Sequence, residues 1–93
     1  MSPEAWTLPW EEAREGLLVH RDRRVVYLNP AAAELLAVDR EKVRGLPLIL
    51  ALRDHRLEAL ALQGGEAVLA VRGRVLAARA RPGLLYLLDV TEA

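Results

Sequence analysis

The stretch EAVLAVRGRVLAARARPGLLYLLDV, residues 66–90, repeats its apolar side chains at every second position, as β-strands do. It predicts three antiparallel strands separated by Gly73-Arg74 and Pro82-Gly83, over residues 66–72, 75–81 and 84–90. Glycine at the first loop position favours a type II′ turn. The resulting register is Glu66 with Arg81, Ala67 with Ala80, Val68 with Arg79, Leu69 with Ala78, Ala70 with Ala77 and Val71 with Leu76. One sheet face is then wholly apolar and the other carries charge, which is typical of a sheet covered on one side.

The last strand is apolar on both faces. Leu84, Tyr86, Leu88 and Val90 share one face, and Leu85, Leu87 and Asp89 share the other. Both faces therefore need cover. We expect helices to cover one face, and an N-terminal tryptophan segment or a second subunit to cover the other. The residues expected at that cap or dimer surface are Trp6, Trp10, Leu85 and Leu87.

Upstream, the sequence predicts a hairpin followed by short helices. The hairpin strands are residues 17–20 and 25–28, joined by a charged turn. Helices are expected at 30–38, 40–44 and 55–63, each preceded by a capping side chain: Asn29, Asp39 and Asp54. Five strands split two and three around a helical insert indicate an α+β domain. We place this domain at residues 12–93 and an N-terminal cap segment at residues 1–11.

Composition excludes several classes of function. The chain has 93 residues, enough for one core, and its 13 basic and 13 acidic residues cancel. The balanced charge argues against a nucleic-acid partner. Without cysteine there are no disulfides, zinc-thiolate sites or thiol catalysis. No apolar run approaches the roughly 20 residues that a membrane-spanning helix needs, so we expect no direct membrane insertion.

The residue types for catalysis are also missing. Apart from the tyrosines, the hydroxyl residues are Ser2, Thr7 and Thr91, all near the ends of the chain. His55 begins a charged helix and His20 precedes a charged turn, so we expect both at the surface and neither as a metal ligand. We therefore expect no catalytic residue, no bound metal and no cofactor, and no enzymatic activity from the chain by itself.

Three segments, in this order and spacing, resemble a PAS domain. GLLVHRDRRVVYLNPAAAELLAV (16–38) resembles its opening hairpin and first helix, DREKVRGLP (39–47) the next helix, and RVLAARARPGLLYLLDVTEA (74–93) its closing strands. Asp89-Val90-Thr91-Glu92 is similar to the signature that ends many bacterial PAS domains before a signalling helix. LALRDHRLEAL (50–60) looks most like the cytoplasmic PAS domain of phosphate-regulon sensor histidine kinases. The chain departs from the family at Arg23 and Ala37, where glycine is common.

The resemblance implies a signal-relay and dimerisation module of a two-component sensor histidine kinase. Asp89 and Thr91 would pass a conformational change into a C-terminal signalling helix. It also implies a homodimer, contact with the kinase domains of a longer parent chain, and a cytoplasmic location in a membrane-anchored parent. The absence of cysteine excludes the covalent flavin and coumarate photosensor chemistries of this family.

Two other functions stay open at this point. One is a small-ligand sensor with a non-covalent ligand between sheet and helices. Its pocket would be lined by Leu36, Leu52, Leu60, Leu69 and Leu88. The other is a small scaffold of the roadblock or profilin-like kind, which also combines a central sheet with helices.

Overall fold

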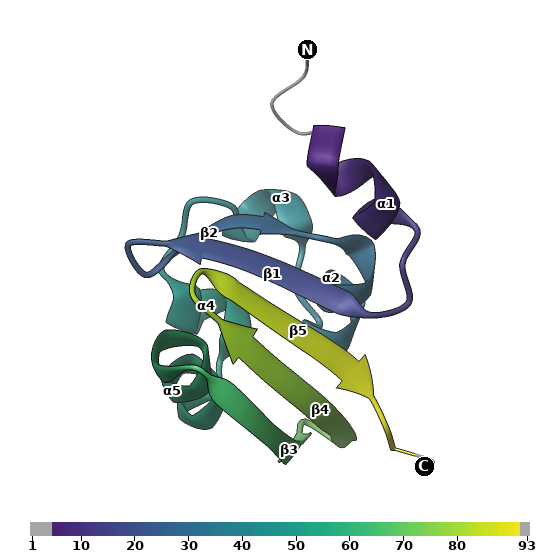
Figure 1. Cartoon of the computed structure of the whole chain (residues 1–93), viewed down its shortest axis with the longest axis vertical. Coiled ribbons are helices and arrows are strands. Elements are labelled where there is room, and N and C mark those ends of the chain that lie inside the picture. The colour runs from purple at the N-terminus through teal and green to yellow at the C-terminus, as the bar shows by residue number, and fades with distance from the viewer. Residues whose placement is uncertain (1–4, 92–93) are drawn as a thin grey trace.

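Five antiparallel strands form one sheet in the order β2-β1-β5-β4-β3 in the computed structural model, which describes residues 5–91 (Figure 1). Helices α2 to α5 lie on one side of this sheet, and the short N-terminal helices lie at its other side. The expected α+β architecture is confirmed. The elements are η1 (Ala5–Thr7), α1 (Leu8–Glu11), β1 (Gly16–Arg21), β2 (Arg24–Leu28), α2 (Pro30–Leu36), α3 (Arg40–Val43), α4 (Leu48–Leu52), α5 (His55–Gln63), β3 (Gly65–Val71), β4 (Arg74–Arg81) and β5 (Leu84–Asp89).

The predicted register of β3 and β4 is wrong by two residues. Glu66 pairs with Arg79, and Val71 pairs with Arg74. The turn residues are Arg72 and Gly73, with φ of 47° and 82°, which is the pattern of a type I′ turn. A shift of two residues preserves which side chains share a face. The apolar face was therefore predicted correctly although its pairing was not.

The two faces of β5 are the reverse of those expected. Leu85 and Leu87 are fully buried in the core, so neither can contribute to a surface. Leu88 lies on the outer face with 43% of its surface exposed, so it does not line a pocket between sheet and helices. The reason is the pairing with β4, which places Leu85 beside Ala80 and Leu87 beside Ala78 on the helix-covered face.

Small residues let α2 lie close to β1. A side-chain carbon placed at Gly16 would lie 3.0 Å from the Cα of Ala32, which is tighter than ordinary van der Waals contact, so the Ala32 backbone would have to shift by a few tenths of an ångström. The segment that follows Pro47 forms α4, and Leu48, Ala51 and Leu52 bury its inner side. Leucine and alanine fill most of this core.

The buried Asn29 side chain joins three parts of the fold. Its Oδ1 accepts hydrogen bonds from the amides of Leu17 and Ala32, both at 2.9 Å. Its Nδ2 donates to the carbonyls of Trp10 and Glu15, also both at 2.9 Å. The side chain therefore caps α2 as predicted, and it also fixes the start of β1 and the N-terminal segment.

We expect Asn29→Ala to lower the free energy of unfolding by about 3 kcal/mol or more, because it leaves buried amides and carbonyls without partners. Asp39→Ala is the matched control, since Asp39 caps exposed amides of α3, and it should cost about 1 kcal/mol. Urea unfolding at pH 7 measures both. Equal losses in the two variants would contradict the central role of Asn29.

Ala37 adopts the left-handed conformation that glycine prefers. It ends α2 with φ of 56° and ψ of 49°. A β-carbon in this region is strained, whereas glycine is not. Alanine at this position therefore adopts, with strain, a conformation that glycine adopts without strain.

Ala37→Gly should raise the free energy of unfolding by about 0.5–1 kcal/mol, because relief of strain in the folded state exceeds the effect of glycine's greater conformational entropy in the unfolded chain. Ala31→Gly, inside α2, should lower it by about 1 kcal/mol. Thermal unfolding of the two variants distinguishes the signs. A loss of stability in Ala37→Gly would contradict the strain argument.

Candidate functional site

Asp89 and Thr91 lie together where the chain leaves β5. Asp89 Oδ1 accepts a hydrogen bond from the Thr91 amide at 2.9 Å and another from the Thr91 hydroxyl. Thr91 Oγ1 in turn accepts from the Val75 amide at 3.0 Å, and the Val90 amide donates to the Val75 carbonyl at 2.8 Å. The two residues expected to relay a signal thus fasten the end of the described chain to the start of β4.

Arg74 completes this network, which we call the exit network (Arg74, Val75, Asp89 and Thr91). Its Nη1 lies 3.1 Å from Asp89 Oδ2. Hydrogen bonds from Thr91 and the Arg74 guanidinium lower the pKa of Asp89, so its carboxylate stays ionised near neutral pH. Sequence reasoning missed Arg74. The Pro82-Gly83 turn could have predicted this contact. A two-residue turn there sets Leu76 opposite Asp89, so Arg74, two residues before Leu76 on β4, is the diagonal neighbour of Asp89.

The N-terminal segment is held to the outer face of the sheet by two clusters of the same composition. In the first, the Trp6 ring meets the Tyr27 ring edge-on at 5.4 Å between centroids. Arg40 binds Glu11 through two hydrogen bonds of 3.1 and 2.9 Å, and its guanidinium lies 5.8 Å from the Tyr27 ring centre. The Tyr27 hydroxyl donates to Glu11.

The second cluster repeats the ring contact, the arginine–tyrosine contact and the arginine–glutamate ion pair farther along the sheet. The Trp10 ring lies 5.9 Å from the Tyr86 ring on β5. Arg79 lies 5.1 Å from the Tyr86 ring centre and pairs with Glu15 at 3.1 Å. The two clusters use both tryptophans and both tyrosines, which are all the aromatic residues of the chain. We call them the cap clasp: Trp6, Glu11, Tyr27 and Arg40, with Trp10, Glu15, Arg79 and Tyr86.

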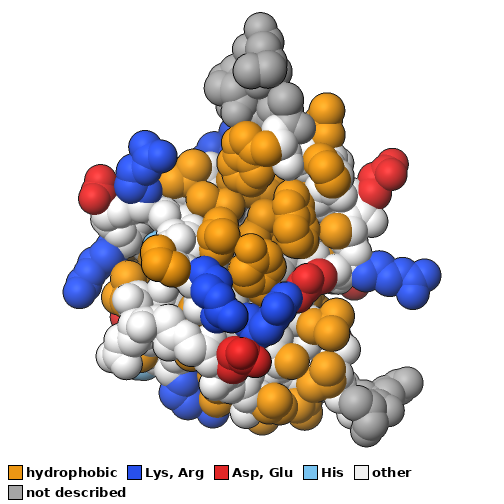
Figure 2. All heavy atoms as spheres, viewed as in Figure 1, with side chains coloured by type: hydrophobic (Ala, Val, Ile, Leu, Met, Phe, Trp, Pro, Cys, Tyr) orange, Lys and Arg blue, Asp and Glu red, His pale blue; other side chains and the backbone are white. Residues whose placement is uncertain are grey.

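The cap clasp has a defined protonation state. Hydrogen bonds from Tyr27 and Arg40 lower the pKa of Glu11, and burial with the neighbouring Glu11 raises the pKa of Tyr27 to about 12. Glu11 is therefore an anion and Tyr27 a neutral donor over the whole physiological range. Apolar side chains gather over the middle of this face next to the cap (Figure 2).

Four of the five side chains expected to line a ligand pocket pack in or against the core. Leu36 and Leu52 are fully buried, and Leu60 and Leu69 pack against the same core. None of these four lines the surface hollows beside Leu88, Thr91 or Trp6.

The histidines and several arginines have structural positions. His20 is 9% exposed, which contradicts the expected surface position, and burial lowers its pKa. His55 is exposed as expected. Arg53 donates to the carbonyls that end α2, and Arg72 to those that end α4. Within residues 5–91, no group of three acidic or histidine side chains could hold a metal ion, and no helix is long and apolar enough to span a bilayer.

The fold is similar to that of solved domains of low sequence identity. A domain of an HTR-like protein from Haloarcula marismortui matches with a TM-score of 0.59 and 17% identity, over 85% of this chain and 100% of that one. A domain of the sensory box sensor histidine kinase/response regulator from Geobacter sulfurreducens matches with a TM-score of 0.49 and 16% identity, over 92% and 90%. No protein-family model and no curated protein matches the chain. The first likeness confirms the expected PAS-like α+β fold.

We expect acid to open the first cluster of the cap clasp. Because the folded pKa of Glu11 lies below its ordinary value of 4.5, its contribution is complete above that pH and is lost as the pH falls through the folded pKa. The Trp6 indole N–H signal in NMR should shift in this range. Glu11→Gln should shift the signal already at pH 7 and abolish the transition.

Glu12→Gln is the matched control, since Glu12 is exposed and adjacent in sequence. It should leave the Trp6 signal and its acid transition unchanged. An unchanged Trp6 signal in Glu11→Gln at pH 7 would show that the carboxylate does not hold the cap.

Proposed function

We propose that the chain is the PAS domain of a sensor histidine kinase and relays a conformational change from its N-terminal cap to a C-terminal signalling helix. The observation that carries this proposal is the exit network, in which Asp89 and Thr91 tie the chain end to β4. The likeness of the fold to the HTR-like domain supports it. The proposal requires no catalytic residue and no bound cofactor.

The relay would act through β5, which touches both ends of the described chain. Tyr86 binds the cap through Trp10, and three residues later Asp89 binds Arg74 and Thr91. β5 is a central strand, paired with β1 on one side and β4 on the other. A change in how the cap sits on Tyr86 would therefore move or loosen β5 against β4, where the exit network is built. Such packed elements shift between discrete arrangements rather than bending continuously.

Within this proposal, the kinase is of the phosphate-regulon type and the domain lies in the cytoplasm of a membrane-anchored parent. The support is the segment LALRDHRLEAL, which forms the last three residues of α4, its left-handed end at Arg53 and the first part of α5. Asp54 caps α5 by accepting hydrogen bonds from the Arg56 and Leu57 amides, and the Arg56 side chain also binds it.

Asp89→Ala and Thr91→Ala should each change autophosphorylation when the chain is fused to the dimerisation and catalytic regions of a sensor histidine kinase. The change should be on the order of fivefold or more, as expected for a coupling of this kind. Asp22→Ala, in the exposed hairpin turn, is the control and should leave the rate unchanged. Wild-type rates in both exit variants, with the domain folded, would refute the relay.

The proposed homodimer would use the outer face of β3, β4 and β5. Val68 and Leu88 are 65% and 43% exposed there and line a hollow of about 330 Å³ with Ala77. Glu66 and Arg79, of opposite charge, lie on the same hollow, so a two-fold related copy would meet complementary charge.

Val68→Arg combined with Leu88→Arg should weaken this dimer by about tenfold or more, because buried arginines without partners disfavour an apolar contact. Leu50→Arg with Leu62→Arg, exposed on α4 and α5, is the matched control and should not. Sedimentation equilibrium measures both. A monomeric wild-type chain at every concentration, or equal effects of the two pairs, would contradict the proposed surface.

A further inference from the structure

A hollow of about 610 Å³ lies between the N-terminal cap, β2 and α3. Its volume is within the range of sites that bind small molecules. It is separate from the exit network and from the apolar outer face of β3 to β5. The described side chains that matter for its chemistry are Trp6, Leu8, Arg21, Val26, Arg40 and Arg44.

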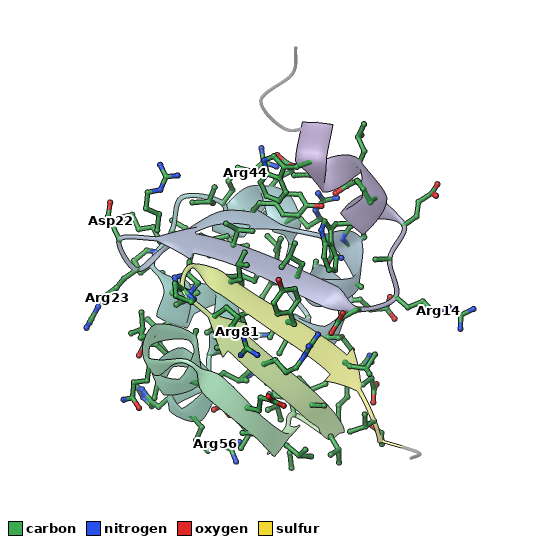
Figure 3. All side chains as sticks on the ribbon, in the orientation of Figure 1. Arg14, Asp22, Arg23, Arg44, Arg56 and Arg81 are labelled. Atoms are coloured by element: carbon green, nitrogen blue, oxygen red, sulfur yellow. The ribbon has the colours of Figure 1, made fainter. Side chains whose placement is uncertain are left out.

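The hollow carries an excess of positive charge, because Arg21, Arg40 and Arg44 line it together with the single carboxylate of Glu11. Both oxygens of Glu11 are engaged by Arg40. Arg21 has no ion pair with any carboxylate in the described part of the chain. Arg44 extends from the end of α3 beside the cap (Figure 3), and its nearest carboxylate, Glu41, is 4.0 Å away with both side chains more than half exposed. Arg21 therefore has no carboxylate partner among the described residues and Arg44 has only a long, exposed one, so both guanidinium groups can bind an anion.

The hollow is also apolar where it is open to solvent. Trp6 is 49% exposed, Val26 is 40% exposed and Leu8 is 69% exposed. A half-exposed indole beside a branched aliphatic side chain offers a surface for a flat or aliphatic group. A guanidinium group can form two parallel hydrogen bonds to the oxygens of a carboxylate or a phosphate ester, whereas the apolar side chains make no favourable contact with an inorganic anion.

We propose that this hollow binds a small organic anion, a carboxylate or phosphate ester that carries an apolar body. The anionic group lies between Arg21 and Arg44, and the apolar body lies against Trp6 and Val26. The bound molecule contacts the cap, β2 and α3 at once, so it holds the cap on the sheet. This site does not depend on the proposed relay, because its binding is measured on the isolated chain without a kinase.

The test titrates the isotope-labelled chain with phenyl phosphate and with benzoate, and follows the two tryptophan indole N–H signals by NMR. Saturable movement of the Trp6 signal, with the Trp10 signal unchanged, is the expected result, because Trp10 lies outside the hollow. Whichever probe binds more tightly identifies the preferred anionic group. Phenol lacks the anionic group and inorganic phosphate lacks the apolar body, so each should bind more weakly by about tenfold or more.

Arg21→Gln combined with Arg44→Gln should reduce the affinity for the better probe by at least about tenfold, as expected for lost charged hydrogen bonds. Arg14→Gln with Arg23→Gln is the charge-matched control. Both of these arginines are exposed and point away from the cap (Figure 3), so this pair should retain the affinity.

Three outcomes would overturn the site. They are the absence of saturable Trp6 movement with both anions, binding of phenol as tight as that of phenyl phosphate, and equal loss of affinity in the two arginine pairs. Thermal unfolding confirms that each double variant is folded, because all four replaced side chains are exposed.

Discussion

The buried side-chain amide of Asn29 forms hydrogen bonds with backbone groups that would otherwise lack partners where three parts of the fold meet. Its two atoms serve the amides that begin β1 and α2 and the carbonyls at Trp10 and Glu15. An aspartate would lose the donor side of this arrangement, and a serine would be too short to reach both sides. Asn29 therefore does more than begin a helix. It fixes the backbone at Trp10 and Glu15, and this positions the N-terminal cap so that both clusters of the cap clasp can form.

The cap clasp explains how a chain with four aromatic residues uses them. None lies between the sheet and the helices, where leucine and alanine make the core. All four lie on the opposite face, where each tryptophan packs against a tyrosine, and that tyrosine in turn contacts an arginine paired with a glutamate. Such partly exposed contacts are individually weak, since ion pairs and cation–π contacts at a surface contribute about 1 kcal/mol or less each. A cap held by several weak contacts, rather than by a continuous core, suits an element proposed to shift during signalling.

Much of the fold follows from local signals in the sequence, whereas the sites depend on long-range pairing. The capping residues Asn29, Asp39 and Asp54 and the alternation in residues 66–90 correctly predicted helices and strands. The predicted register of β3 and β4 was wrong because Arg72 adopts a positive φ, which is unusual for arginine and could not be predicted from its residue type. The prediction of which face of β5 is buried was wrong because both faces are apolar. Only the pairing of β5 with Ala78 and Ala80 of β4 decides between them. The cap clasp pairs Arg40 with Glu11, which are 29 positions apart in the sequence, and Arg79 with Glu15, which are 64 positions apart. No local sequence pattern indicates such pairs.

The central claim is that the cap and the exit network are coupled through β5. Amide hydrogen exchange at Val75 tests it most directly, because that amide donates to Thr91 and lies far along the sheet from Trp10. The account predicts that Trp10→Ala, which frees Tyr86 from the cap, speeds exchange at Val75 by about fivefold or more. Leu62→Ala, on the exposed side of α5, should have no effect there. Unchanged exchange at Val75 in Trp10→Ala, while amides of the cap exchange faster, would contradict the coupling.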